Sequence, residues 1–431
     1  MIIGIDGKNV KQVFKYLKDA KQRLAIIAQS PDFPDKMGEQ VLGVPVVQSS
    51  KGKDQLVEVI RVLNEWTIFP KLFGLRFDTT SDNTGRHIGS VTLIEKAKGH
   101  SLMWVACRHH SIEVHVKKVA KHCLGETTSP HYHLFKQLHD NWLEVVVDSD
   151  HSGIDYSSLE LYQWGESEVL DKRANEVMNW ALEMLDKKTW KRGDYKQVVE
   201  LVLVWLCGVD MVHPGWKFHH PAAYHHAKFV SQINYIMKYS MLDDQVTWTS
   251  DEDRMKIKRM VPYIALYHAP SFLKSPIAIR APYNDLMSYQ QVRMFREVDS
   301  EVAELVLKSF SGQCWYLDES WITVSLLDDR LSNEERMLLA KTLDKIPRPE
   351  VISPIPITRM LHTNKVNSEE FWTGSQDLPS LSLLMGSRSW LIPNLLKLSS
   401  EDMVWLKEPV ESWMNYTSYN RMKLFSPSWR L

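Results

Sequence analysis

Hydrophobic residues in the first 145 positions alternate between short continuous runs and helical spacing. The continuous runs predict strands at residues 1–5, 23–29, 72–77 and 101–107, and either a strand or an extended loop at residues 42–47. Apolar residues recur every three or four positions in three other stretches, which predicts half-buried helices at residues 55–66, 90–98 and 112–123. Strands that alternate with helices indicate an α/β domain with parallel pairing through right-handed crossovers.

From about residue 160 to residue 345 the strand signal nearly disappears. Helical spacing predicts helices at residues 171–185, 195–207, 222–241, 253–267, 298–310 and 333–345. Ser332 precedes the last of these and Glu335 follows it by three residues, which is the spacing of a capping box. We therefore expect three parts: an α/β core at 1–145, a helical insertion at 146–345, and a C-terminal segment at 346–431 that returns toward the core and begins with the proline-rich residues 346–358.

The composition limits the classes of protein to consider. The chain has 431 residues, enough for two or three structural units, with 44% hydrophobic and 24% charged residues. It has no apolar run of about 18 residues, so no membrane span is expected, and no signal-peptide pattern. Its four cysteines are widely separated, which favours a reducing compartment, nucleus or cytoplasm. A net charge of −1 gives no global attraction for nucleic acid, so any DNA contact must be local.

Candidate chemistry gathers at the ends of three predicted strands. Asp6, Asp78 and Cys107 each follow a strand, and parallel sheets place functional groups at the carboxyl ends of their strands. Two carboxylates there suit Mg²⁺ or Mn²⁺, which prefer oxygen ligands, and Gly7 would allow a sharp turn after Asp6. The alternative is that these aspartates only cap turns, because FDTTSDNTG is rich in capping residues. Within the metal-site hypothesis, Asp82 of the same loop is a competing ligand.

These residues resemble a known family. IDGK at 5–8, FDTTSDNTGR at 77–86 and WVACRHH at 104–110 together resemble transposon-encoded proteins that look like distant relatives of hAT-superfamily transposases. Cys107-Arg108-His109-His110 matches the CxxH motif of that superfamily. Asp6 and Asp78 match its first two catalytic aspartates. Three later segments resemble the same family: FHHPAAYHHAKFVSQINYIMK at 218–238, SPIAIRAPYNDL at 275–286 and MGSRSWLIPNLLKL at 385–398.

The resemblance implies a ribonuclease-H-like mixed sheet with a large all-helical insertion. It also implies Mg²⁺- or Mn²⁺-dependent DNA cleavage and strand transfer, with Asp6 and Asp78 as catalytic metal ligands. Two features depart from the family pattern: no D-x-A-E-R-G-like motif supplies the third acid, a glutamate, and no zinc finger precedes the core. We therefore expect a transposase-derived DNA-binding protein that is incomplete or inactive as a nuclease. Its expected partners are DNA and, as a candidate, further copies of the same chain, and no small-molecule cofactor is expected. The alternative is a non-catalytic scaffold that binds DNA or protein.

Several other groups of cysteine, histidine, basic and acidic residues could bind a metal or phosphate, and most of them also have a structural explanation. Cys107, His110, His122 and Cys123 suggest a zinc site, but about 18 Å of helix would separate the two pairs. Cys107, Arg108 and His110 remain candidates for either DNA contact or structure. The histidines between His213 and His226 indicate an interhelical junction more readily than a metal site. Candidate phosphate contacts are Lys228, Lys274 and Arg280. The missing glutamate has poor substitutes among the acids of the insertion, which are Asp318, Glu319, Asp328 and Asp329.

Overall fold

The computed structural model describes most of the chain, and its description covers residues 1–10, 21–30, 39–126, 132–146, 153–187, 189–190, 192–213, 215–221, 228–247, 249–354, 364–372 and 378–424. For residues 6–10, 21, 146, 228–229 and 424 it covers the backbone alone. The chain forms two compact units. The sheet unit comprises residues 1–111, 275–287 and 311–431, and the helical unit comprises residues 112–274 and 288–310.

These units differ in extent from the predicted parts. The first segment of the sheet unit ends at Ser111, whereas the predicted core extends to residue 145. Residues 311–345, predicted as part of the helical insertion, belong to the sheet unit. Three described helices cross the division: α4 (Arg108–Leu124), α12 (Ala281–Met294) and, by its last residue, α13 (Ser300–Ser311). A continuous helix gives no local signal at the point where its packing partners change, so sequence periodicity places no boundary there.

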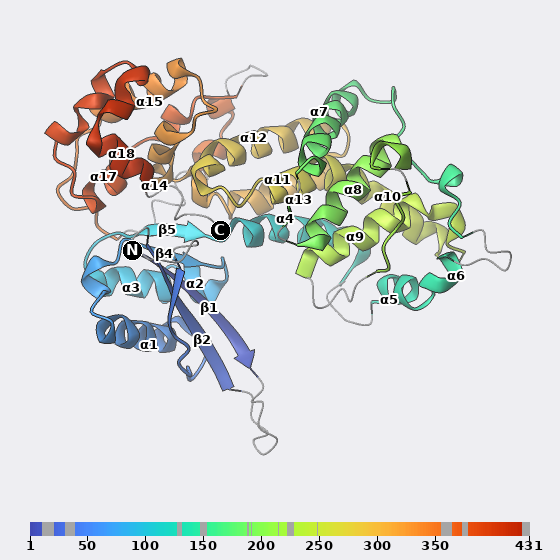
Figure 1. The fold of residues 1–431 in the computed structure, drawn as a ribbon, viewed down its shortest axis with the longest axis horizontal. Helices are drawn as coiled ribbons and strands as arrows, with labels where there is room; N and C mark the ends of the chain where they lie inside the picture. Colours follow the sequence, from blue (N-terminus) through green and yellow to red (C-terminus); the bar gives the residue numbers. More distant parts are fainter. Residues whose placement is uncertain are drawn as a thin grey trace. The chain divides into compact units, whose positions relative to one another are not determined.

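The sheet has five strands in the order β3-β2-β1-β4-β5 (Figure 1). Their bounds are β1 Ile2–Val10, β2 Lys21–Gln29, β3 Glu39–Gly43, β4 Gly74–Phe77 and β5 Met103–Ala106. β1, β2 and β3 pair antiparallel, whereas β4 pairs parallel to β1 and β5 parallel to β4. The sheet is therefore mixed, and parallel pairing by crossovers holds for β1, β4 and β5 alone.

One face of the sheet carries the apolar core of the unit. Ile3, Ile26 and Leu75 share this face by register and are fully buried, with no exposed area. α1 (Gly52–Glu65) packs on α3 (Ser90–Lys98), and a Cβ at Gly43 would lie 3.6 Å from the methyl groups of Val62 on α1. The face of α1 that carries buried Val59, Val62 and Leu63 therefore covers the sheet, as the periodicity of residues 55–66 predicts.

The outer edge of β5 is closed by residues from far along the chain. The Trp321 indole donates a hydrogen bond of 2.7 Å to the carbonyl oxygen of Trp104, and the Tyr316 hydroxyl donates one to the carbonyl oxygen of Ala106. Both side chains are about 1% exposed. Unpaired carbonyls on an edge strand invite pairing with another chain, and here aromatic donors satisfy them.

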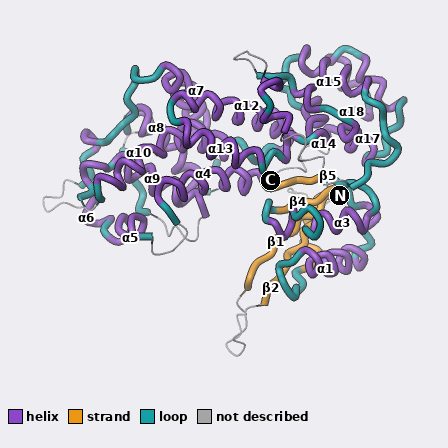
Figure 2. Tube along the Cα trace, turned by 180° about the vertical axis from the view of Figure 1, so that it is seen from behind, coloured by secondary structure: helices purple, strands orange, loops and turns teal. Residues whose placement is uncertain are grey.

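The remainder of the sheet unit is helical and made of short elements (Figure 2). Its further helices are α2 Ser81–Thr84, α14 Glu319–Ile322, α15 Asn333–Lys345, α17 Leu391–Leu395 and α18 Thr417–Leu424, with 3₁₀ turns between them at η1 Phe69–Lys71, η6 Ala278–Arg280, η8 Trp315–Leu317, η9 Thr323–Leu327, η10 Glu369–Trp372, η11 Leu381–Leu384, η12 Ser387–Trp390, η13 Glu401–Lys407 and η14 Val410–Asn415. α15 has the predicted bounds, and its Ser332–Glu335 capping box is present.

The helical unit has no strand among its described residues. Its helices are α5 His133–Asp140, α6 Trp142–Val146, α7 Glu168–Leu185, α8 Gly193–Cys207, α9 Lys228–Met241, α10 Asp251–Tyr263, α11 Ala269–Leu273 and α13 Ser300–Ser311. α8 is central, because nine consecutive residues, Val198–Leu206, are buried and it packs on α7 and α9. The helix predicted at 253–267 changes to a π-helical turn at Ile264–His268. No described helix of the chain is long and apolar enough to cross a membrane.

Candidate functional site

Asp78 follows β4 and is held by its own loop. Its Oδ1 accepts hydrogen bonds from the Thr80 amide at 3.2 Å, the Thr80 hydroxyl at 2.6 Å and the Asn83 side-chain amide at 2.7 Å. Asn83 is buried and its own oxygen accepts from the Ser90 hydroxyl at the start of α3. All of these bonds go to one carboxylate oxygen; Oδ2 accepts none from a described residue. Asp78 therefore fills the capping role and still presents an oxygen.

The register of the sheet relates Asp6 to Asp78. β1 pairs with β4 at an offset of 72 residues, as in Gly4 opposite Arg76. Carried two residues further, the same offset sets Asp6 opposite Asp78. β5 pairs with β4 at an offset of 29 residues, which sets Cys107 next in the same row. The printed pairing of β1 with β4 ends at Gly4 and Arg76. Its extrapolation, with adjacent strands about 4.8 Å apart, predicts that the three positions lie in one row across three parallel strands.

The local structure at Asp6 differs from the prediction. β1 does not end at Asp6 but continues to Val10, and Asp6 pairs with Ala25 of β2 while Gly7 pairs with Leu24. Gly7 is thus a strand residue and not the site of a sharp turn. The antiparallel partner strand extends β1, and a pattern within β1 itself could not reveal that. The side chain of Asp6 lies outside the described residues, so its distance to Asp78 is not defined.

A half-buried polar bridge that the sequence did not suggest lies beside this row. Arg76 of β4 reaches Glu39 of β3 with an N–O distance of 3.1 Å, and Gln29 of β2 donates to the same Glu39 oxygen at 2.6 Å. The Arg76 side chain passes over Gly4 of β1, where a Cβ would lie 3.5 Å from the Arg76 guanidinium. An arginine within the apolar run LFGLRF was the signal for it, because a charge in a buried strand needs a partner.

The CRHH segment begins α4. The Cys107 amide donates to the carbonyl oxygen of Phe77 at 2.8 Å, which continues the β4–β5 pairing, and its carbonyl accepts from the Ser111 amide in the first turn of the helix. Arg108 is 1% exposed; it forms an ion pair with Asp285 and donates to the Ser275 carbonyl at 3.1 Å. In this arrangement Arg108 is a core residue with no surface for a phosphate. His110 is partly exposed.

The four acids weighed as substitutes for the missing glutamate have structural partners. Asp318 caps α14 through the Ser320 amide, and a Glu319 oxygen accepts from the Arg388 amide at 2.9 Å. Asp328 is 1% exposed and accepts from Arg330, while Asp329 lies 3.5 Å from Arg280. None of the four is adjacent in register to Asp78. Among the side chains that the structure describes, which exclude Asp6, no group of three or more His, Cys, Asp or Glu has metal-binding geometry.

The zinc alternative is weakened by the helix itself. α4 runs without interruption over Arg108–Leu124, so His110 and His122 are separated by about 18 Å at 1.5 Å per residue. The His122 ring instead lies 2.9 Å from Glu301. Burial raises the pKa of the Cys123 thiol to about 11, which favours the protonated form over a thiolate ligand.

The histidine cluster surrounds a buried lysine in the helical unit. Lys238 is 1% exposed, donates to the His219 carbonyl at 2.6 Å and lies over the Trp142 ring at 5.3 Å. Burial lowers its pKa to about 7. The His220 ring meets His139 edge to face, with ring centroids 5.2 Å apart. His225 and His226 lie outside the described residues.

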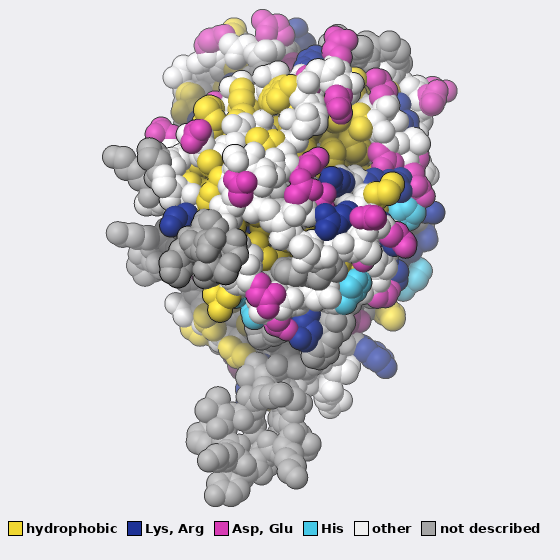
Figure 3. Space-filling view, turned by 90° about the vertical axis from the view of Figure 1, so that its right-hand side faces the viewer, with side chains coloured by type: hydrophobic (Ala, Val, Ile, Leu, Met, Phe, Trp, Pro, Cys, Tyr) yellow, Lys and Arg dark blue, Asp and Glu magenta, His cyan; other side chains and the backbone are white. Residues whose placement is uncertain are grey.

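Charged side chains do not segregate on the described surface that Figure 3 presents, where basic and acidic groups are interspersed. Several basic residues of the helical unit are paired: Arg259 with Asp299 at 2.6 Å, Lys258 with Asp243 at 2.8 Å, and Lys256 with Glu252 at 2.5 Å. Of the predicted phosphate contacts, Lys274 lies 5.9 Å from the Trp180 ring, and the side chain of Lys228 lies outside the described residues. These ion pairs reduce the attraction of the paired side chains for DNA phosphates.

Comparison of the chain with known protein families, with curated proteins and with solved structures finds no match in any of the three. The functional argument therefore rests on the residues and geometry of the site.

Proposed function

We propose that this protein has a ribonuclease-H-like core of transposase origin and binds DNA where β4 and β5 end, with a divalent ion held by Asp78 at the end of β4 and by Asp6 within β1. The observation that carries the proposal is the row that the sheet register predicts for Asp6, Asp78 and Cys107. The strand order 3-2-1-4-5, with three antiparallel strands followed by two parallel ones, is the order expected of such a core.

The residues fit a hard divalent ion. Asp78 keeps Oδ2 clear of its capping bonds, and Asp6 on the neighbouring strand would supply the second carboxylate. Mg²⁺ or Mn²⁺ would supply Lewis acidity toward a phosphodiester. The protein would fix the two carboxylates and orient the strand, and water or a DNA 3′-hydroxyl would be the nucleophile.

Two acids without a third favour binding over turnover. None of the other acids considered lies in the row, and a site with two carboxylates fixes an ion poorly. We therefore propose that the DNA-binding role dominates and that cleavage is weak or lost. A non-catalytic scaffold that binds DNA or another protein is the second candidate. The net charge of −1 and the interspersed charges on the described face in Figure 3 favour it, because that face provides no broad electrostatic footprint for a duplex. The proposed compartment is the nucleus, because both the DNA-binding protein and a DNA-binding scaffold would meet their DNA there.

Calorimetric titration with Mn²⁺ tests the metal site. We expect binding to the wild-type chain and a loss of at least about tenfold in affinity in both D6N and D78N, since each removes one charged ligand. D82N is the matched control, because Asp82 lies in α2, the short helix that follows Asp78, and is outside the row. Unchanged Mn²⁺ affinity in D78N would contradict the assignment.

Titration of a fluorescent DNA duplex at several salt concentrations separates the two candidates. Affinity that falls steeply with salt, with or without Mn²⁺-dependent cleavage, supports the DNA-binding proposal. The absence of binding at low salt, in a preparation that retains Mn²⁺ affinity, would leave the protein-binding scaffold.

A further inference from the structure

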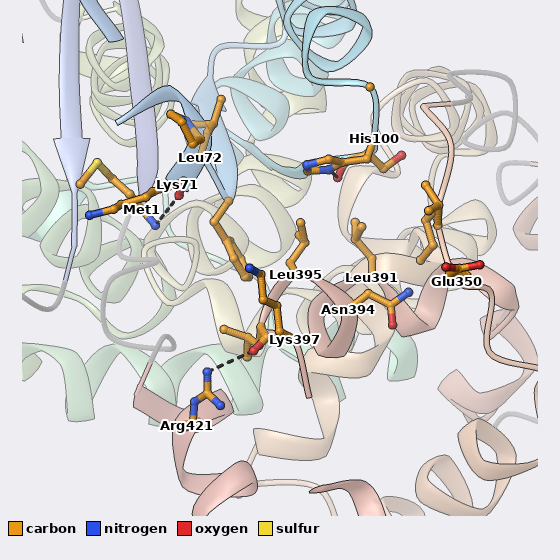
Figure 4. Close-up of a pocket in the computed structure, with 17 residues that line it drawn as sticks. Met1, Lys71, Leu72, His100, Glu350, Leu391, Asn394, Leu395, Lys397 and Arg421 are labelled. Atoms are coloured by element: carbon orange, nitrogen blue, oxygen red, sulfur yellow. Dashed lines mark hydrogen bonds between the residues drawn. The ribbon is translucent and has the colours of Figure 1, made fainter. Parts of the chain in front are cut away.

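A pocket of about 660 Å³ opens in the sheet unit at the edge where β4 and β5 begin, the edge opposite to Asp78. The lining consists of Met1, residues 70–73 before β4, residues 99–101 before β5, residues 350–352, residues 391 and 394–397, and Arg421 of α18 (Figure 4). This volume lies in the range of small-molecule sites. The pocket shares no residue with the row of Asp6, Asp78 and Cys107.

The inner wall of the pocket is apolar. Leu72, Phe73, Ile352, Leu391 and Leu396 line it, and each is at most 7% exposed. The wall is also well anchored, because the Ser101 amide donates to the Ile352 carbonyl at 2.8 Å, which ties residues 350–352 to the start of β5. A preformed apolar wall favours the apolar part of a ligand over water.

Three cationic side chains line the mouth of the pocket, those of Lys71, Lys397 and Arg421. The His100 ring lines it too, and Glu350 is the one acidic residue among the lining. In Figure 4 the Lys397 side chain and the His100 ring extend toward the space between Leu72 and Leu395, whereas Glu350 lies at the far side. The chain as a whole carries a net charge of −1, so this local excess of positive charge is a property of the pocket.

The backbone and hydrogen bonds fix both of these inward groups. Lys397 has a φ of +54°, a left-handed conformation that favours glycine, directly after α17. The Leu396 carbonyl beside it accepts from Arg421 at 3.1 Å. The Nδ1 atom of His100 lies 2.9 Å from the Ser101 carbonyl oxygen, which can only accept, so Nδ1 carries the proton and Nε2 is directed away from that bond.

We propose that this pocket binds a small organic anion with an apolar body, whose carboxylate or phosphate head pairs with Lys397. The apolar wall accommodates the body of the ligand, and the cationic mouth selects an acidic head over a neutral one. The inference is independent of the proposed metal site, because neither aspartate of that site lines the pocket.

Three ten-carbon probes test the proposal by calorimetry on the full chain: decanoate, decyl phosphate and decanol. Decanoate and decyl phosphate share the apolar body and distinguish the two kinds of acidic head, while decanol has the same body without charge. We expect saturable one-to-one binding of at least one of the two anions, at least about tenfold tighter than decanol, as one charge-assisted hydrogen bond provides. Equal affinity for decanol, or no binding of either anion, would overturn the proposal.

Variant K397N locates the site. Asparagine tolerates a left-handed backbone, so this variant removes the charge without a new conformational cost. We expect anion affinity to fall about tenfold while decanol is unaffected. K341N, an exposed lysine of α15 outside the pocket lining, is the matched control and should bind like the wild type. Unchanged anion affinity in K397N, with the fold intact by circular dichroism, would also overturn the assignment.

Discussion

Arg108 and Asp285, 177 positions apart in sequence, form an ion pair in the interior of the sheet unit. The Arg108 guanidinium also donates to the Ser275 carbonyl and lies 5.6 Å from the Tyr316 ring, whose hydroxyl closes the edge of β5. The pair thus links the start of α4, the start of α12 and the cover of the sheet edge. A buried charge without its partner is strongly destabilising.

We therefore expect R108M to lower the free energy of unfolding of the sheet unit by about 3–5 kcal/mol. The double variant R108M/D285L should recover much of this loss, since neither side chain then leaves an uncompensated charge. Burial raises the pKa of Asp285 and Arg108 opposes that shift. Removing Arg108 raises the pKa further above the unfolded value, so the deficit of R108M should shrink as the pH falls from 7 toward 5. Urea unfolding with hydrogen exchange on sheet-unit peptides measures both effects; a deficit independent of pH would contradict this account.

Asp78 allows its capping role to be separated from its charge. Oδ1 accepts all three hydrogen bonds within the loop, and asparagine retains an oxygen at that position. We expect D78N to change the free energy of unfolding by less than about 0.5 kcal/mol, whereas D78A should cost about 1–2 kcal/mol through loss of the cap. Chemical denaturation of the two variants gives the comparison. Equal stability of D78A and the wild type would show that the loop does not depend on these bonds.

Gly89 permits a close backbone approach before α3. A Cβ at this position would lie 2.4 Å from the Gly85 amide nitrogen and 2.5 Å from the Asn83 carbonyl oxygen, distances that real contacts do not reach. We expect G89A to destabilise the sheet unit by about 2–3 kcal/mol or more and to disturb the Asp78 loop. G43A is the control in the same unit, because its Cβ would make ordinary contacts of 3.6 Å with Val62. Thermal unfolding that ranks G43A below G89A would refute the packing argument.

Acid sensitivity of the helical unit should arise from two buried histidines. His268 ends the π-helical turn, and neither ring nitrogen has a hydrogen-bond partner among the described residues. His115 stacks on Phe310 with ring centroids 5.0 Å apart. Burial lowers the pKa of each to about 3 from 6.5, with His268 and Lys118 adding to the shift at His115.

Because both folded-state values lie below the unfolded value, the unfolded chain binds more protons in acid. Stability is then complete above about pH 6.5 and falls as the pH drops toward 3. We expect H268F to flatten the pH dependence of Tm of the helical unit between pH 7 and 4.5, measured by calorimetry, relative to the exposed control H213Q. A pH profile of H268F that parallels the wild type would exclude His268 as a source.

Part of the candidate site follows from local pattern. The aspartate at the end of LFGLRF lies where the sequence places it, because β4 is a short apolar run bounded by capping residues, and a local pattern is enough to define such an element. The capping box at Ser332 and Glu335 is local in the same way. The sequence resemblance singled out Asp6 and Asp78, but it could not show how the two positions relate in space.

Tertiary structure decided what depends on distant partners. β1 runs through Asp6 to Val10 because β2 pairs along its whole length, and the first three strands are antiparallel because of that pairing. Arg108, a candidate for DNA contact by motif, is buried because Asp285 and Tyr316 surround it. The pocket proposed to bind an organic anion joins residues from Met1 to Arg421. The sequence by itself determined where apolar runs and helical spacing occur, since hydrophobic periodicity is local. Only the folded chain determined how far β1 extends, strand directions, burial and which charges meet, since these are set by contacts between residues far apart in sequence.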